Sequence, residues 1–328
     1  MAMTDYFLPN AFKLRELTAA INHVPYVPAR LRQLGWFQES GSSTVDIAVE
    51  EQNGVLAIVP VAPRGGPAAQ TDKAPRILRS FRAPHLPVEA HIYADEVQGV
   101  RVFGSDGAAQ VLETVRNERI ATMRQNLEYT LEYHRALAVK GSFMDANGNI
   151  RSLFTEFGAV QQTVVIPLSP TVSSGIRGKM FTVAKDMRAG LGGTPRTGIR
   201  VLAGDAFWAA LMSDKDVQAT YLNQIQAAEL RGDVRNSFDA FGATWEWYEG
   251  TTEVSLGDDA YAVPEGVPGL FITRYAPADY NETVNTIGLP FYSKAQPKDM
   301  DRGWDMEAQS NPLNIITRPG AVIKLSLT

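Results

Sequence analysis

The longest periodic segment of the sequence runs from Asp106 to Lys140, and it constrains the fold more than any other feature. Gly141 follows a terminal lysine, as is typical of a helix C-terminus. At 1.5 Å per residue the predicted helix is roughly 50 Å long. Its apolar stripe is interrupted by Arg116, Arg119 and His134. A helix this long with an interrupted stripe is poorly buried when it stands alone.

A second unusual segment precedes this helix, with the sequence APRGGPAAQTDKAPRILRSFRAPHLP at positions 62–87. It holds several prolines and few side chains of a size that could build a core. We therefore predict that residues 55–92 form a long extended arm projecting from the body, with a mobile surface loop as the alternative. The segment is also basic, and its cations are Arg64, Lys73, Arg76, Arg79 and Arg82.

Charge is unevenly distributed along the chain. Residues 236–273 contain seven acidic residues and no Lys or Arg, in contrast to the basic segment. The formal net charge is -5, which argues against general affinity for nucleic acid, because neutralising phosphates requires a basic surface. The chain has no cysteine, as expected of folding in a reducing cytoplasm, and no apolar run long enough to span a membrane.

The remaining patterns indicate mixed α and β structure. Residues 1–43 suggest an arm that contains a short helix over 11–20. The alternation of apolar and polar residues from Val45 to Val49 predicts a strand, which a turn at Asn53-Gly54 would pair with residues 55–61 in a hairpin. Helices are expected over 175–190, 207–212 and 215–230, and the rest is mainly extended. Trp245, Trp247 and Tyr248 alternate as in a half-buried strand, and core packing is the favoured interpretation.

The stretch FMDANGNIRSLFTEF, residues 143–157, allows two interpretations. Asp145, Asn147, Asn149 and Glu156 match the oxygen ligands of a calcium loop, but the required sixth-position glycine is replaced by Ile150. Asn147-Gly148 instead suits a two-residue hairpin turn in which both central residues adopt positive φ. The hairpin is favoured.

No catalytic apparatus is visible in the sequence. There is no G-x-S-x-G turn, the four histidines match no zinc motif, and GLGGTPRTG at 190–198 lacks the features of a phosphate loop. We predict no catalytic, cofactor-binding or metal-binding residues and no cofactor.

Six stretches carry a resemblance to a known family. They are VAPRGGP (61–67), FRAPHLP (81–87), VFGSDG (102–107), GDAFWAALMSDKDV (204–217), NTIGLPFYSKAQP (285–297) and QSNPLNIITRPGAVIKLSLT (309–328). In this order and spacing the chain resembles the lambda-type major capsid protein family (phage capsid E family) of tailed bacteriophages, which carries the Hong Kong 97 capsid fold.

The resemblance implies an α+β chain with four parts. Residues 1–54 would form an N-terminal arm and first hairpin, and 55–92 an extended loop (E-loop) over the neighbouring subunit. Residues 93–195 and 276–328 would form a peripheral domain around a spine helix at 106–140, and 196–275 an axial domain at the capsomer centre. The chain lacks the long helical N-terminal extension of some relatives, so assembly guidance is expected from a separate scaffolding protein.

The implied function is self-assembly into hexamers and pentamers of an icosahedral shell around double-stranded DNA, bound without sequence specificity. A portal and a decoration protein are further expected partners, no membrane is involved, and the virion would be assembled in the host cytoplasm. We expect Arg76, Arg79 and Arg82 to lie against an acidic surface of an adjacent subunit. The predicted inter-subunit contacts are Arg64, Lys73, Arg76, Arg79, Arg82, Arg116 and Arg119. A bacterial nanocompartment shell (encapsulin-like) of the same fold and a soluble enzyme remain alternatives.

Overall fold

The computed structural model describes residues 14–23, 29–52, 76–97, 108–220, 237–251 and 253–327 of the 328-residue chain. Its α-helices are α1 (Leu14–His23), α2 (Arg30–Gln33), α3 (Ala94–Val97), α4 (Ala108–Val139), α5 (Leu153–Phe157), α6 (Ile176–Gly190) and α7 (Asp205–Ser213). Residues 215–220 are also helical. Single 3-10 turns lie at η3 (Asn281–Thr283), η4 (Asp299–Asp301) and η5 (Pro319–Ala321).

The strands of the described residues fall into five sheets. The largest has six strands in the order β7 (Thr163–Val165), β16 (Ile323–Ser326), β11 (Ala260–Glu265), β8 (Gly198–Ala203), β10 (Ala243–Trp247) and β9 (Ser237–Ala240). One three-stranded sheet has the order β1 (Phe37–Gly41), β12 (Phe271–Tyr275), β15 (Pro312–Ile316). A second has the order β13 (Tyr292–Pro297), β14 (Gly303–Ser310), β4 (Leu86–Tyr93). Two-stranded pairs are β2 (Asp46–Gln52) with β3 (Arg76–Arg82), and β5 (Ser142–Met144) with β6 (Ile150–Ser152).

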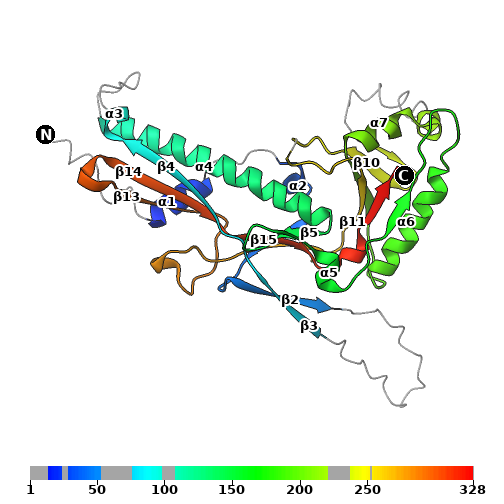
Figure 1. Cartoon of the computed structure of the whole chain (residues 1–328), viewed down its shortest axis with the longest axis horizontal. Helices are drawn as coiled ribbons and strands as arrows, with labels where there is room; N and C mark the ends of the chain where they lie inside the picture. The colour runs from blue at the N-terminus through cyan, green and yellow to red at the C-terminus, as the bar shows by residue number, and fades with distance from the viewer. Residues whose placement is uncertain are drawn as a thin grey trace, which may run out of the picture.

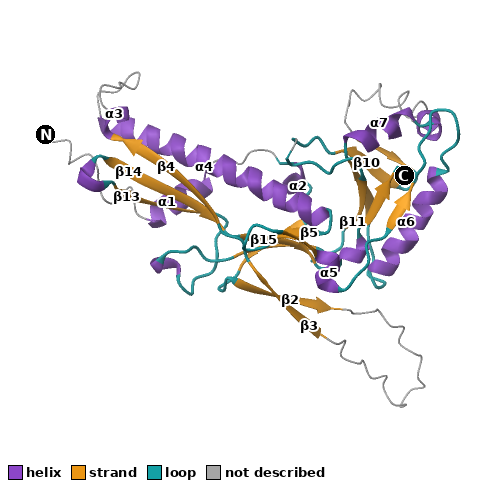
Figure 2. Ribbon diagram, viewed as in Figure 1, coloured by secondary structure: helices purple, strands orange, loops and turns teal. Residues whose placement is uncertain are grey.

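The molecule is elongated, and α4 runs along most of its length (Figure 1). One end consists of the β13-β14-β4 sheet, covered by α1 and the first half of α4. The other end is compact and holds the six-stranded sheet with α6 and α7. The β1-β12-β15 sheet lies between the two ends beneath α4, and Figure 2 shows the β2–β3 pair leaving the body as a ribbon.

Helix α4 confirms the prediction of a long helix within the described residues, and it also explains the interrupted stripe. Leu112 and Leu127 of this helix pack into one apolar cluster with α1, β4 and β14, whereas Ala138 and Val139 at its C-terminal end belong to the larger cluster of the compact end. In the middle of the helix Arg124 and Glu128 are buried as an ion pair, with Nη2 and Oε1 3.0 Å apart. The helix therefore connects two hydrophobic cores, so no single apolar stripe is needed.

The ribbon differs from the predicted hairpin. Strand β2 pairs antiparallel with β3 along its whole length, from Asp46 opposite Arg82 to Gln52 opposite Arg76. The predicted partner of β2, residues 55–61, lies outside the described residues. The chain then continues from β3 into β4, and residues 86–93, most of which were expected in the extended loop, pair with β14.

The hairpin at Asn147-Gly148 exists, but its turn is longer than predicted. Met144 pairs with Ile150, so five residues form the loop, and of these only Gly148 has a positive φ, at 79°. The Asp145 carboxylate accepts hydrogen bonds from the backbone N–H groups of Asn147 and Asn149, both at 2.9 Å. These bonds stabilise the wider turn, so the prediction of a two-residue turn was wrong. The Asp145 carboxylate binds backbone N–H groups of its own loop.

The compact end is built from segments that are distant in sequence. The sheet combines residues of the predicted axial segment 196–275 with β7 and the C-terminal β16, which lie outside it. Helix α6 confirms the helix expected at 175–190 and packs on β7 and β16. Trp245 is fully buried between Phe207 and Phe238, which confirms the core-packing interpretation of the aromatic segment.

Candidate functional site

The base of the β2–β3 ribbon is held to the body by aromatic packing. Phe81 meets Phe143 edge to face, with ring centroids 5.2 Å apart, and stacks on Phe157 at 5.9 Å. Ile47 and Val49 of the facing strand are buried beside it. Because strand side chains alternate between faces, this apolar face fixes the direction in which the ribbon leaves the body.

The ribbon places the predicted basic residues on different surfaces. Arg79 is half-buried, and its guanidinium lies 5.3 Å from the centre of the Phe157 ring, a cation–π contact. Arg82 is exposed, and its side chain makes no ion pair or hydrogen bond within the described residues. Arg76 is placed by its backbone at the far end of β3, whereas Arg64 and Lys73 lie outside the described residues.

Arg116 and Arg119 lie on the first half of α4, whereas the ribbon base contacts Phe143 just beyond the C-terminal end of this helix. Arg116 contacts Glu113 of the preceding turn at 3.2 Å, and Arg119 reaches Glu96 of α3 at 2.8 Å. The twenty residues from Arg119 to Val139 span roughly 30 Å of helix. The structure therefore does not bring these two arginines together with the basic residues of the ribbon.

The acidic segment is divided between paired and free carboxylates. Glu246 and Glu265 bind arginines of the same chain, and Asp259 binds Lys324 at 2.7 Å. Glu249, Glu253 and Asp258 are exposed, with no ion pair or side-chain hydrogen bond in the part of the chain that the structure describes. Asp239, the seventh acid, accepts a hydrogen bond from the Thr244 hydroxyl at 2.5 Å. Among the described residues, Glu249, Glu253 and Asp258 are therefore the acids of this segment that remain available to bind another molecule.

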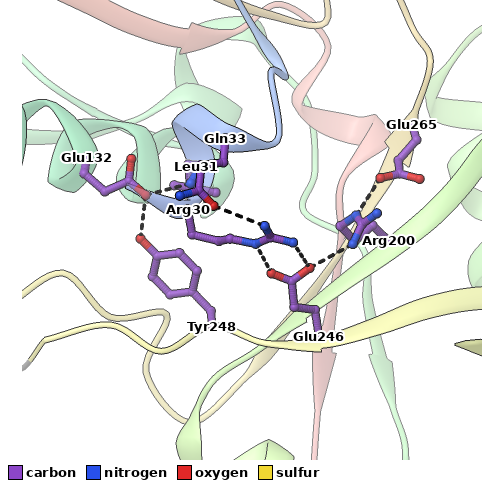
Figure 3. A network of polar contacts seen from close by, with 8 residues as sticks. All are labelled: Arg30, Leu31, Gln33, Glu132, Arg200, Glu246, Tyr248 and Glu265. Carbon is purple, nitrogen blue, oxygen red and sulfur yellow. Dashed lines mark hydrogen bonds and ion pairs between the residues drawn. The ribbon is translucent and has the colours of Figure 1, made fainter. Parts of the chain in front are cut away.

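A buried polar network connects α2 and α4 to the six-stranded sheet (Figure 3). Oε2 of Glu246 accepts hydrogen bonds from Arg30 at 2.9 Å and from Arg200 at 2.8 Å, and Arg30 also contacts Oε1. Arg200 in turn donates to Glu265 at 2.6 Å. The four charges alternate in sign, so the buried Glu246 lies between two partly exposed cations.

Glu132 of α4 forms the second part of this network. Its Oε1 accepts hydrogen bonds from the backbone N–H of Leu31 at 2.7 Å and from the hydroxyl of Tyr248 at 3.1 Å. Its Oε2 is buried and has no hydrogen-bond partner among the described residues. Burial raises the pKa of Glu132, although the hydrogen bond from Leu31 opposes the rise, and burial also raises the pKa of Tyr248.

Sequence patterns could not indicate this network. Arg30 and Glu246 are 216 positions apart, and neither lies in a motif. The local signal at Glu246 was its place in an alternating strand, where an acidic residue usually points to solvent. Glu246 of β10 meets Arg200 of β8 because these two strands are neighbours in the sheet, which the sequence does not reveal.

In the described ranges there is no group of three or more His, Asp or Glu residues placed to hold a metal ion. His91 pairs with Asp305 at 2.7 Å, and His85 contacts Asn311 at 2.9 Å, so each ring has a structural partner. None of the described helices combines the length and hydrophobicity that a membrane span requires.

Comparison with protein families gives one match across the chain. A family model described as phage major capsid protein E matches residues 13–327. Two curated relatives are the major capsid proteins of Salmonella phage Felix O1 and Pseudomonas phage KPP10. Each is 23% identical, with 95% of both chains covered in the first case and 97% of both in the second.

Solved structures with the same fold include two capsid proteins. The crystal structure of a prophage capsid protein from E. coli CFT073 has a TM-score of 0.56 at 14% identity. The match covers 96% of this chain and 99% of the prophage chain. The capsid of cyanophage P-SCSP1u has a TM-score of 0.51 at 10% identity, covering 92% and 88%. These likenesses establish the Hong Kong 97-type α+β fold that the sequence predicted.

Proposed function

Because the chain belongs to the phage major capsid protein E family, we propose that identical copies assemble into hexamers and pentamers of the icosahedral head of a tailed bacteriophage. The family match and the curated relatives favour this function over a nanocompartment shell. A closed shell arises when heterologous contacts repeat about rotation axes. Stability is then shared between many copies, each contact being modest.

The observation that carries the proposal is the β2–β3 ribbon. A two-stranded ribbon is at best marginally stable in isolation, and the described packing of this one against the body lies around Phe81, Ile47 and Val49. Its exposed positions include Ala48, Ser80 and Arg82. We propose that the outer part of the ribbon is covered by an adjacent copy in the shell.

The parts of the molecule take the following roles in this proposal. Helix α4 is the spine of a peripheral domain, 93–195 and 276–328, and residues 196–275 form an axial domain near the capsomer centre. The pairing of β4 with β14 supports an extended loop that ends near residue 85 rather than 92. The pairing of β7 and β16 with the large sheet supports adding both strands to the axial part. Residues 1–54 supply the N-terminal arm and β2.

The proposed inter-subunit contacts remain those predicted. Arg76, Arg79 and Arg82 of the ribbon are proposed to lie against acidic surface of the neighbour, and Arg82 is the clearest candidate because it has no partner within the described chain. Arg116 and Arg119 are proposed to add contacts beside their local partners. Arg64 and Lys73, which lie outside the described residues, are included on charge alone.

Other partners are proposed from the capsid role. A separate scaffolding protein guides assembly in the host cytoplasm, a portal occupies one vertex, and a decoration protein binds the finished shell. Packaged double-stranded DNA fills the interior without sequence-specific contacts, in agreement with the net charge of -5.

The test is electron microscopy and sedimentation of the expressed chain. We expect shells built of hexamers and pentamers, whereas a small discrete oligomer at every concentration would contradict the proposal. The triple variant R76E/R79E/R82E should assemble poorly at low salt, because reversed charges repel the acidic surface. R15E/K215E/R302E, which makes the same change of net charge at exposed basic residues outside the proposed contacts, is the matched control. Normal shells from the triple variant at low salt would remove the ribbon contact from the proposal.

A further inference from the structure

Helix α6 presents a basic stripe to solvent. Its buried face consists of Ile176, Met180, Val183 and Met187, which pack into the compact end. Arg177, Phe181, Lys185 and Arg188 are all exposed, and at 3.6 residues per turn they lie within an arc of about 80°. The stripe therefore consists of three cations around one aromatic ring.

The cations of this stripe are free. Within the described ranges, Arg177, Lys185 and Arg188 make no ion pair or side-chain hydrogen bond. Arg30 and Arg200, by contrast, both bind carboxylates. Three neighbouring cations without a carboxylate repel one another, so this surface is suited to an acidic partner.

The stripe also borders a groove that is lined by apolar side chains and by Arg177 and Arg196. Phe181 is 75% exposed and lines this groove of about 430 Å³ together with Met180, Ala184 and Phe241. Phe241 has a φ of 55° in the turn between β9 and β10, where Asn or Gly is usual. A bulky residue in the left-handed region is strained, and such strain often marks a functional surface. Exposed aromatic rings are enriched at contacts between proteins, so Phe181 favours a protein partner for this surface.

The complementary surface is present on the same chain. Glu249, Glu253 and Asp258, the three free carboxylates, lie in the loop that joins β10 to β11. Figure 1 places this loop on the side of the compact end that faces α2 and α4, whereas α6 lies on the other side, beyond β7 and β16. Two complementary patches on different sides of one body suit a head-to-tail contact, which forms a ring when the rotation between successive copies closes.

We propose that the α6 stripe of one copy docks on the β10–β11 loop of the next copy around a capsomer. The three cations of the stripe face the three free carboxylates, and Phe181 is buried at the centre of the contact. The charges set the register and speed the encounter, and the aromatic ring supplies apolar burial. This inference rests on the proposed function and specifies one contact by which the shell is built.

Charge reversal and rescue test the contact. R177E/K185E/R188E reverses the stripe, E249K/E253K/D258K reverses the loop, and all six positions are exposed, so both variants should fold. Each alone should lower the initial rate of shell assembly at low salt on the order of tenfold, with a smaller defect at high salt. The combined variant should restore assembly. Light scattering gives the rate, and microscopy gives the shell yield.

A matched control separates local pairing from net charge. Combining the stripe reversal with E89K/E118K/D299K restores the same net charge through exposed acids elsewhere on the chain. This control should not recover assembly. Phe181→Ala should also slow assembly while leaving the melting temperature of the unassembled chain unchanged.

Mixing experiments show whether the contact joins different copies. A ring of six in which the two singly reversed proteins alternate satisfies every contact, whereas a ring of five leaves one contact mismatched. The mixture should therefore recover hexamers more fully than pentamers or closed shells.

Several outcomes would overturn the docking. They are normal shells from either single reversal, no rescue in the combined variant, or equal rescue by the control. Normal shells that lose nuclease-resistant DNA after stripe reversal would assign α6 to DNA instead. In each of these cases the wild-type chain still forms shells, so the proposed function stands. If the wild type forms no shells, the proposed function fails and the docking fails with it.

Discussion

The hydroxyl of Tyr248 donates a hydrogen bond to Oε1 of Glu132, and this 3.1 Å contact joins the end of β10 to the spine helix α4. The same carboxylate holds the first turn of α2 through Leu31. One buried acid thus connects three segments that lie far apart in sequence. Its second oxygen, Oε2, has no hydrogen-bond partner among the described residues.

This arrangement predicts a specific pH dependence of stability. Because burial raises the pKa of Glu132 above its ordinary value of 4.5, the ionised carboxylate destabilises the folded state at neutral pH. That unfavourable contribution disappears as the pH falls through the raised pKa, and it is absent below 4.5, where both states are protonated. Glu132→Gln should therefore gain more stability, relative to wild type, at neutral pH than in acid.

Urea unfolding of the unassembled chain over a pH series measures this difference. Tyr248→Phe is the companion variant, because it removes a hydrogen bond that favours the ionised form of Glu132. It should raise the pKa of Glu132 further, so that the pH-dependent change in stability extends to higher pH. A difference between Glu132→Gln and wild type that does not change with pH would show that the carboxylate titrates normally.

Removing Glu246 should destabilise the compact end. The change Glu246→Ala leaves Arg30 and Arg200 without their shared acceptor, and the loss of charged hydrogen bonds predicts about 2–3 kcal/mol. The Arg30 side chain is 42% exposed, so water offsets part of its loss. Glu118→Ala, at an exposed position of α4, should change the free energy of unfolding by no more than about 0.5 kcal/mol. Equal effects of the two variants would contradict the role of the network.

Truncating Phe81 should loosen the ribbon at its base. Phe81→Ala removes the contacts with Phe143 and Phe157 and should cost about 3 kcal/mol of stability. Hydrogen exchange of the β2 and β3 amides should accelerate more than that of the six-stranded sheet. Phe181→Ala, the same change at an exposed site, should leave both measurements near wild type. Unchanged exchange in β2 and β3 would mean that other contacts hold the ribbon.

Two glycines of α6 should respond in opposite directions to alanine. A Cβ at Gly190 would lie 2.1 Å from the carbonyl oxygen of Gly320, so Gly190→Ala must displace backbone and should lower the melting temperature. Gly178 has no atom within 4 Å of that position, and Gly178→Ala should stabilise by about 0.5–1 kcal/mol through helix propensity. Thermal unfolding of the two variants side by side tests both, and a stable Gly190→Ala would mean that η5 can move away from α6.

Element positions were predictable where the signal is local. The apolar periodicity and Gly141 predicted α4 to within a few residues, and the helix expected at 175–190 is α6. The short helix expected at 11–20 is α1, shifted to Leu14–His23 within the described residues. Local turn chemistry was less reliable at Asn147-Gly148, because the Asp145 side chain stabilises a wider loop than the dipeptide alone would favour.

The sequence by itself determined the long helix, the basic and acidic segments and the family, because periodicity, net charge and ordered motifs are read along one chain. Only the tertiary structure decided which charges are free. Glu246 and Glu249 are three residues apart, yet one binds Arg30 and Arg200 and the other faces solvent. The physical reason is that ion pairing depends on distance in space, and the partners of Glu246 come close only when α2, β8 and β10 are packed together.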